Sequence, residues 1–139
     1  MIVLDTNVLS ELMRPAPAES VMRWMAALPA ASLYTTSVTQ AEILHGIMLL
    51  PSGRRRSGFE AAAEAMFKED FAGRILAFGS DAARLYASIA ADRHRAGRPI
   101  SHFDAQIAAT ARSAGAAIAT RNVPDYDGCG VNLINPWKD

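Results

Sequence analysis

The sequence of 139 residues has one cysteine, two lysines and no long hydrophobic run. The single cysteine, Cys129, excludes an intrachain disulfide and gives no sign of an oxidising compartment. No stretch approaches the roughly 20 consecutive apolar residues of a membrane-spanning helix, so we expect no membrane segment. Asp5 interrupts the apolar start and no basic stretch precedes it, so we expect no secretory signal and a cytoplasmic location.

The sequence also lacks an excess of either charge. It has 14 Lys and Arg against 14 Asp and Glu, for a formal net charge of 0. This balance removes overall basicity as an argument for nucleic-acid binding, although opposite charges can still be segregated on the surface. Hydrophobic residues make up 50% of the chain, which excludes a disordered protein. The length suits one core, so we expect residues 1–139 to form a single domain.

Short apolar segments alternate with segments of helical spacing along the chain. The expected strands are residues 2–4, 33–38, 75–78, 116–120 and 132–135. The expected helices are residues 8–13, 19–28, a helix that begins at the capping box of residues 39–42 and continues to 50, about 59–72, 81–95 and about 102–114, with an exposed connection at 51–58. This alternation is typical of βαβ units. It predicts an α/β fold with three layers, α/β/α, around a mainly parallel sheet of four to five strands.

Three acidic residues are placed to meet at one edge of such a sheet. Asp5 follows the first strand, Glu42 lies near the start of the helix after the second, and Asp104 is the third residue after the Ser101 cap of another helix. The carboxyl ends of parallel strands share an edge, and ligands bind there. Converging carboxylates repel one another, and Mg²⁺ or Mn²⁺ relieves the repulsion because these ions prefer oxygen ligands. The sequence therefore predicts a metal site suited to phosphodiester hydrolysis.

Each acid also has a structural explanation that the sequence leaves open. Thr39 and Glu42 have the spacing of a capping box, in which Glu42 would bond to the start of its own helix. Asp104 suits the positive end of a helix, and Asp5 can form a turn into the helix that follows it. Glu42 and Asp104 taken singly are well explained by capping, whereas an acid such as Asp5 at the end of the first strand has no such usual structural role. The three together favour a site.

Four motifs occur in order along the chain. They are MIVLDTNVLSEL at residues 1–12, TSVTQAE at 36–42 with Gly46, FDAQIAA at 103–109, and TRN at 120–122 with NPW at 135–137. Together they resemble the PIN-domain family, and more narrowly the VapC/FitB type of toxin in type II toxin–antitoxin pairs. The resemblance covers essentially the whole chain.

This resemblance implies a PIN-like fold and an endoribonuclease that depends on Mg²⁺ or Mn²⁺ to activate water. It implies a homodimer, which can join a larger toxin–antitoxin complex, and a small antitoxin whose C-terminal segment covers the active site. Asp5, Glu42 and Asp104 match the acidic residues that hold the metal and carry catalysis. The matching polar residues that support the site are Thr6, Asn7, Ser37 and Thr120. Thr6 and Ser37 are explained equally well as helix-cap or turn hydroxyls.

The fourth acidic position departs from the family pattern. Asn122 stands where the family often has Asp. An amide can accept a hydrogen bond or orient water in catalysis, but it adds no charge. Asp125, three residues later, is the alternative fourth acid, and the departure weakens the case for a second metal ion.

Basic residues offer candidate contacts to a substrate phosphate. Arg121, at the end of an expected strand, is the strongest candidate, with an ion pair to one of the acids as its alternative. Arg98 belongs to a second basic cluster with Arg93, His94 and Arg95, for which a solvated helix end is an equal explanation. The run at residues 54–56 is more typical of a solvated loop than of an RNA or antitoxin contact.

Two other functions compete with the nuclease. A non-catalytic PIN-like module that binds RNA or a protein partner is compatible with Asn122. A Rossmann-like phosphatase is less compatible, because the lysines, Lys68 and Lys138, do not follow a central strand. No glycine-rich loop follows the first strand, which argues against dinucleotide binding.

Overall fold

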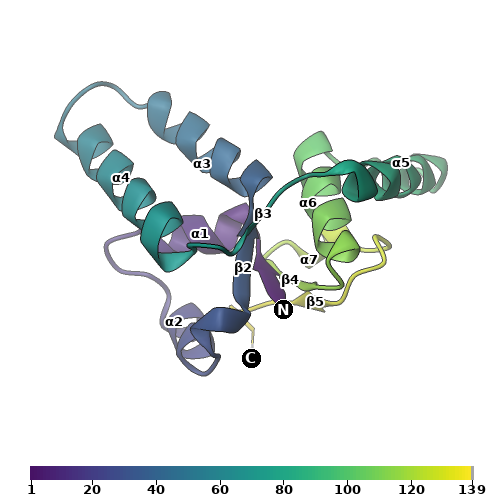
Figure 1. Cartoon of the computed structure of the whole chain (residues 1–139), viewed down its shortest axis with the longest axis horizontal. Coiled ribbons are helices and arrows are strands. Elements are labelled where there is room, and N and C mark those ends of the chain that lie inside the picture. Colours follow the sequence, from purple (N-terminus) through teal and green to yellow (C-terminus); the bar gives the residue numbers. More distant parts are fainter. Residues whose placement is uncertain (139) are drawn as a thin grey trace.

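A five-stranded parallel sheet forms the centre of the molecule in the computed structural model, which describes residues 1–138 (Figure 1). The strand order is β3-β2-β1-β4-β5. The strands are β1 (Ile2–Leu4), β2 (Leu33–Thr36), β3 (Ile75–Leu76), β4 (Ala117–Ala119) and β5 (Leu133–Ile134). All four pairings between these strands are parallel. The expected parallel sheet is confirmed, with five strands.

Seven helices cover the sheet. They are α1 (Thr6–Leu12), α2 (Glu19–Ala26), α3 (Ser37–Met48), α4 (Arg54–Ala65), α5 (Ser80–Arg95), α6 (His102–Ser113) and α7 (Val123–Tyr126), counted within residues 1–138. A 3₁₀ turn (Ala30–Ser32) precedes β2, and a π-helical turn (Met66–Asp70) follows α4. In Figure 1, α3 and α4 project together from one side of the sheet, while α5 and α6 lie on the other.

The core is divided between the two faces of the sheet. Successive side chains of a strand point to opposite faces. Val3 accordingly packs with Ile89 and Ile107, from α5 and α6, whereas Leu4 packs with Val8 of α1 and Phe67 of the π-helical turn. Each apolar cluster packs helices against one face of the sheet, which gives the three layers, α/β/α, that the sequence predicts.

Helix α3 begins earlier than the sequence predicts. The hydroxyl oxygen of Thr36 accepts a hydrogen bond from the Thr39 N–H at 3.0 Å, so Thr36 is the N-cap and the strand expected at 33–38 ends there. Glu42 consequently lies more than one turn inside the helix. The capping box of Thr39 and Glu42 is therefore wrong, because another residue caps the helix.

The basic run at residues 54–56 is also placed differently from the prediction. The segment 51–58, expected as an exposed connection, includes the first five residues of α4. Gly53 precedes the helix at a φ of 152°, which side-chain-bearing residues rarely adopt. Arg56 forms an ion pair at 2.7 Å with Glu60, which lies one helical turn farther along α4. Such pairs stabilise an exposed helix.

The other differences concern short elements and element ends. Helix α2 ends at Ala26 rather than at residue 28, and β3 stops at Leu76 rather than at residue 78. The short helix α7 was not expected. The helices of the described chain are too short or too polar to cross a membrane.

Candidate active site

Asp5 is buried where β1 ends and α1 begins. Its carboxylate caps α1 by accepting the Val8 N–H at 3.2 Å, and the Asn7 N–H and the Thr120 hydroxyl also bond to it. The residue is only 2% exposed. Burial raises the pKa of Asp5 from 3.8 to about 6, against the lowering effect of these bonds, and the nearby charge of Asp104 adds to the rise. Asp5 thus forms the expected turn into α1 and still carries a costly buried charge.

Glu42 points from α3 toward the start of α1. The Thr6 hydroxyl donates to its carboxylate at 2.7 Å and lies 3.2 Å from the Thr39 hydroxyl. Burial raises the pKa of Glu42, the charge of Asp104 raises it further, and the Thr6 bond lowers it. The Thr6 hydroxyl therefore orients an acid, which supports its predicted role beside the site.

Asp104 lies in the first turn of α6. Its N–H donates to the Ser101 hydroxyl oxygen at 3.1 Å, as the sequence predicts for a capped helix. Its carboxylate accepts a hydrogen bond from the Tyr126 hydroxyl at 3.2 Å. Burial raises the pKa of Tyr126 far above its usual range, and the charges of Asp5, Asp104 and Glu42 raise it further. One buried hydroxyl thus experiences the field of all three acids.

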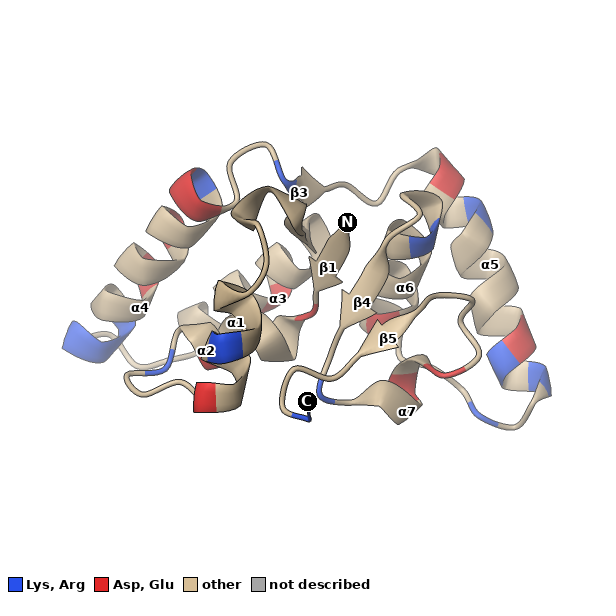
Figure 2. Cartoon of the chain, turned by 90° about the horizontal axis from the view of Figure 1, so that it is seen from below, with Lys and Arg blue, Asp and Glu red and all other residues tan. Residues whose placement is uncertain are grey.

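Asp5, Glu42 and Asp104, called here the acidic edge, lack cationic partners within residues 1–138. Figure 2 shows acidic segments in the middle of the molecule, around α3, β1 and α6, with most basic segments farther out. In the described chain, no three His, Cys, Asp or Glu side chains already form a metal-ligand cluster. Carboxylates with hydroxyl neighbours are nevertheless the donors that Mg²⁺ and Mn²⁺ prefer, so the residues present fit such an ion.

The polar residues after the strands lie close to this edge. Ser37 is the first residue of α3, directly after β2. Thr120 is buried, and its hydroxyl oxygen accepts the Asn122 N–H at 3.0 Å. Asn122 is the N-cap residue of α7 and its side chain is exposed. Asp125 is also exposed and lines, together with Asp104, a hollow of about 250 Å³.

Comparison with known proteins places these features in a family. The PIN-domain family model matches residues 2–123. This chain belongs to the PIN-domain family. It is 40% identical over 138 residues to "VapC ribonuclease Y4jK" of Sinorhizobium fredii, with 99% of each chain covered. It is 37% identical to "Toxin FitB" of Neisseria gonorrhoeae over the full length of both. A solved FitAB complex bound to a DNA fragment superposes with a TM-score of 0.93 at 37% identity, covering 100% of this chain and 97% of the other. The chain is therefore a PIN domain of the VapC/FitB toxin type.

Arg121 of this PIN domain stands directly after Thr120, at the carboxyl end of β4. Its guanidinium lies 5.2 Å from the centre of the Trp137 ring, and its side chain is exposed. A cation over an aromatic face is held in place while its outer side stays in water. The alternative ion pair with one of the acids is not formed within the described residues.

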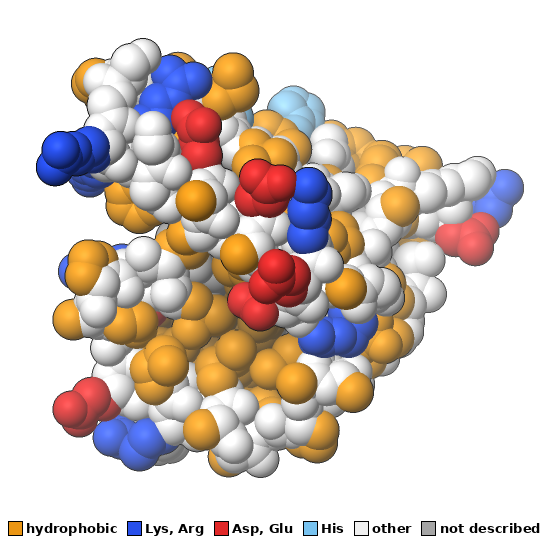
Figure 3. Space-filling view, turned by 60° about the vertical axis from the view of Figure 1, so that its left-hand side comes forward, with side chains coloured by type: hydrophobic (Ala, Val, Ile, Leu, Met, Phe, Trp, Pro, Cys, Tyr) orange, Lys and Arg blue, Asp and Glu red, His pale blue; other side chains and the backbone are white. Residues whose placement is uncertain are grey.

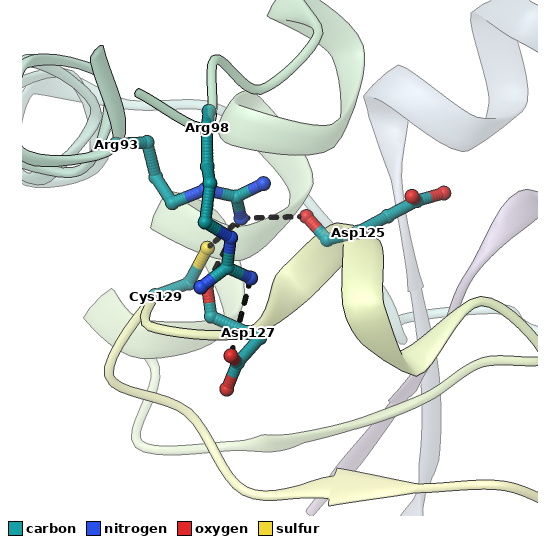
Figure 4. A network of polar contacts seen from close by, with 5 residues as sticks. All are labelled: Arg93, Arg98, Asp125, Asp127 and Cys129. Carbon is teal, nitrogen blue, oxygen red and sulfur yellow. Dashed lines mark hydrogen bonds and ion pairs between the residues drawn. The ribbon is translucent and has the colours of Figure 1, made fainter. Parts of the chain in front are cut away.

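The second basic cluster is not a free cationic surface. Arg98 pairs with Asp127 at 3.1 Å. Arg93 is only 8% exposed and donates to the backbone carbonyls of Arg98 at 2.7 Å, Asp125 at 2.8 Å and Asp127 at 3.0 Å (Figure 4). Arg93 and Arg98 with these partners are called here the arginine corner. Neither explanation given for Arg93 is right, because its guanidinium is inside the protein and bonded to the chain.

No motif in the sequence marks Tyr126 as part of the site. The only sequence signal is its place six residues after Thr120, in a segment rich in turn-forming residues. Such a segment gives no periodicity from which the direction of a side chain follows. The contact with Asp104 depends on α7, which itself was not expected.

Proposed function

We propose that this PIN domain is a metal-dependent endoribonuclease and the toxin of a type II toxin–antitoxin pair. The observation that carries the proposal is the acidic edge, in which the charge of Asp104 raises the pKa of both Asp5 and Glu42 and none of the three acids has a cationic partner in the described chain. Burial of like charges is costly and is typical of sites that bind a cation. Relatives of matching length named as a VapC ribonuclease and as a toxin support the same activity.

Asp5, Glu42 and Asp104 would hold Mg²⁺ or Mn²⁺. When bound, the cation neutralises developing charge and lowers the pKa of water, so that hydroxide is available near neutral pH. Asp5 is fixed by its capping bonds at the end of β1, and Thr6 orients the carboxylate of Glu42. The protein thereby fixes the direction of the ligands before RNA binds.

The RNA phosphate would be bound by exposed groups beside the acidic edge. Arg121 is the principal candidate, since stacking on Trp137 leaves its guanidinium accessible at the sheet end. Arg98 is half-exposed and can shift from Asp127 to a phosphate at small cost, because exposed ion pairs are weak. Asn122 would orient the attacking water, with Asp125 as the alternative from the hollow beside Asp104.

A hollow next to Glu42 suits the C-terminal segment of an antitoxin. It measures about 340 Å³ and is mainly apolar, with Met13, Ile47, Leu50 and Phe59 among its lining residues. Figure 3 shows an apolar hollow on one face of the molecule, and a second hollow has Leu12, Met25, Met66 and Phe71 among its lining residues. The FitAB complex among the solved relatives supports a protein partner for this chain.

Exposed apolar side chains support the proposed homodimer. Met48 is 66% exposed and Leu49 is 71% exposed at the end of α3, and Phe103 is 50% exposed at the start of α6. Apolar side chains gathered on a surface favour protein contacts. Two such copies, each with its antitoxin, would form the larger complex.

The decisive experiment compares cleavage of a structured RNA by the wild type and by Asp5→Asn, with Mg²⁺, Mn²⁺ or EDTA. We expect cleavage by the wild type only with metal, and a loss of more than about 100-fold in Asp5→Asn, because removing a ligand exceeds the 10–100-fold effect of removing a group behind a ligand. Asp81→Asn is the matched control, since Asp81 is an exposed acid of α5. No metal-dependent cleavage by any of the three proteins, with RNA still bound, would instead support a non-catalytic binding module.

A further inference from the structure

Tyr126 is a buried phenol whose hydroxyl points at an acid of the proposed metal site. Its side chain is 2% exposed and packs in the apolar cluster with Val3 and Ile107. Its hydroxyl donates to Asp104 Oδ1 at 3.2 Å. An apolar ring with its single polar atom bonded to a carboxylate behaves as a fixed support, because the packed ring cannot move without losing contacts.

The arginine corner fixes the backbone on both sides of Tyr126. The same nitrogen of Arg93, Nη1, donates to the carbonyls of Asp125 and Asp127, the two neighbours of Tyr126 in sequence. These two bonds tie the segment around Tyr126 to the end of α5 (Figure 4), and Nε of Arg93 donates to the carbonyl of Arg98 in the connection after α5. A planar guanidinium fixes direction better than an ammonium, because its donors keep a rigid geometry.

The remaining neighbour of this guanidinium is a thiol and not an anion. Cys129 Sγ lies 3.8 Å from Arg93 Nη1, and burial raises the pKa of Cys129, so the sulfur stays neutral. Arg93 lies in the last turn of α5, where a helix favours a cation, and its charge is met by the carbonyl oxygens of Arg98, Asp125 and Asp127. Its bonds serve to hold the chain around α7.

We infer that Tyr126 is a positioning residue of the metal site, with its hydroxyl fixing the carboxylate of Asp104 and Arg93 fixing Tyr126. This inference rests on the proposed function. Groups that hydrogen-bond a metal ligand set its direction, and their loss costs 10–100-fold in metal affinity or activity. Asn122 is exposed and uncharged, so the support beside Asp104 comes from a neutral donor of α7.

The test is the affinity of the full chain for Mn²⁺, measured by titration calorimetry without RNA. We expect Tyr126→Phe to weaken Mn²⁺ binding by about 10-fold, since the ring stays packed and only the hydroxyl is lost. Tyr86→Phe is the matched control: its hydroxyl also contacts the start of α6, at His102 Nδ1 2.6 Å away, but does not reach Asp104. We expect it to bind Mn²⁺ like the wild type.

Arg93→Lys, made in the wild type and in Tyr126→Phe, tests the second link. If Arg93 acts through Tyr126, Arg93→Lys weakens Mn²⁺ binding in the wild type and adds no further loss in Tyr126→Phe. Melting temperatures of all variants show which of them are folded. Tyr126→Phe alone decides the first link if Arg93→Lys does not fold.

The outcomes separate the inference from the function on which it rests. Wild-type protein that does not bind Mn²⁺ would overturn the proposed function and the inference together. Wild-type binding that Tyr126→Phe leaves unchanged would overturn the inference alone. A loss of equal size in Tyr86→Phe would also overturn it, because the effect would then belong to α6 as a whole.

Discussion

The acidic edge and the arginine corner both bury charge, but they do so in opposite ways. Arg93 is only 8% exposed, and its guanidinium donates hydrogen bonds to three backbone carbonyls. Asp5 is 2% exposed and has a neighbouring acid that raises its pKa. A buried charge with all its partners stabilises the fold around it, whereas buried like charges cost stability and are kept where a site needs them. The comparison separates a structural cluster from a functional one.

The sharpest test of this contrast is the effect of neutralising each charge. Asp5→Asn should stabilise the metal-free protein at pH 8 by about 3 kcal/mol, the free energy that corresponds to a pKa shift from 3.8 to about 6. Asparagine caps a helix as well as aspartate does, so the cap on α1 is preserved. Urea unfolding in EDTA measures the difference from the wild type.

The stabilisation by Asp5→Asn should depend on pH, because Asp5 titrates differently in the folded and unfolded protein. The folded pKa of Asp5 exceeds the unfolded value, so folded protein binds more protons between about pH 4 and pH 6, and its unfolding free energy falls as the pH rises through that range. The advantage of Asp5→Asn should therefore grow from pH 4 to pH 6 and stay constant above. A difference in unfolding free energy between Asp5→Asn and the wild type that is the same at all pH values would contradict the burial of an ionised Asp5.

Neutralising the arginine corner should have the opposite effect. Arg93→Met keeps the length of the side chain but leaves three carbonyls without their donor, which should lower the unfolding free energy by about 2 kcal/mol. Arg95→Met is the matched control on the same helix end, because Arg95 is exposed and only loosely paired with Asp92 at 3.5 Å. Thermal unfolding of both variants measures the effect. Equal melting temperatures for Arg93→Met and Arg95→Met would contradict a structural role for Arg93.

The smallest effect should come from the exposed ion pair of the arginine corner, between Arg98 and Asp127. The Arg98 side chain is 49% exposed and that of Asp127 is 65% exposed, so water and salt screen their attraction. A double-mutant cycle with Arg98→Ala and Asp127→Ala should give a coupling of less than about 1 kcal/mol, and 1 M salt should remove it. A larger or salt-insensitive coupling would show that the corner is stabilised by its ion pair rather than by Arg93.

Much of the fold followed from local patterns in the sequence. The strand segments alternate with helices, and their parallel pairing and three layers are confirmed. The edge shared by Asp5, Glu42 and Asp104 followed from the same topology, because parallel strands end on one side. The start of α3 was misplaced, since Thr36 and Thr39 both have cap chemistry and only the hydrogen bond at Thr36 distinguishes them.

Local sequence patterns do not predict the direction in which a single side chain points. Arg93 has the same sequence context as its exposed neighbours Arg95 and Arg98, and its burial depends on where the chain after β4 returns. Tyr126 reaches Asp104 across 22 positions in the sequence for the same reason.

The sequence by itself determined the class of fold, the edge at which the acids lie and the family to which the chain belongs. These features depend on periodicity, on strand order and on short motifs, all of which are local or topological. Only the tertiary structure decided that Thr6 supports Glu42, that Tyr126 supports Asp104 and that Arg93 is structural. Those roles come from hydrogen bonds between distant segments, and such bonds depend on distances of a few tenths of an ångström that packing alone sets.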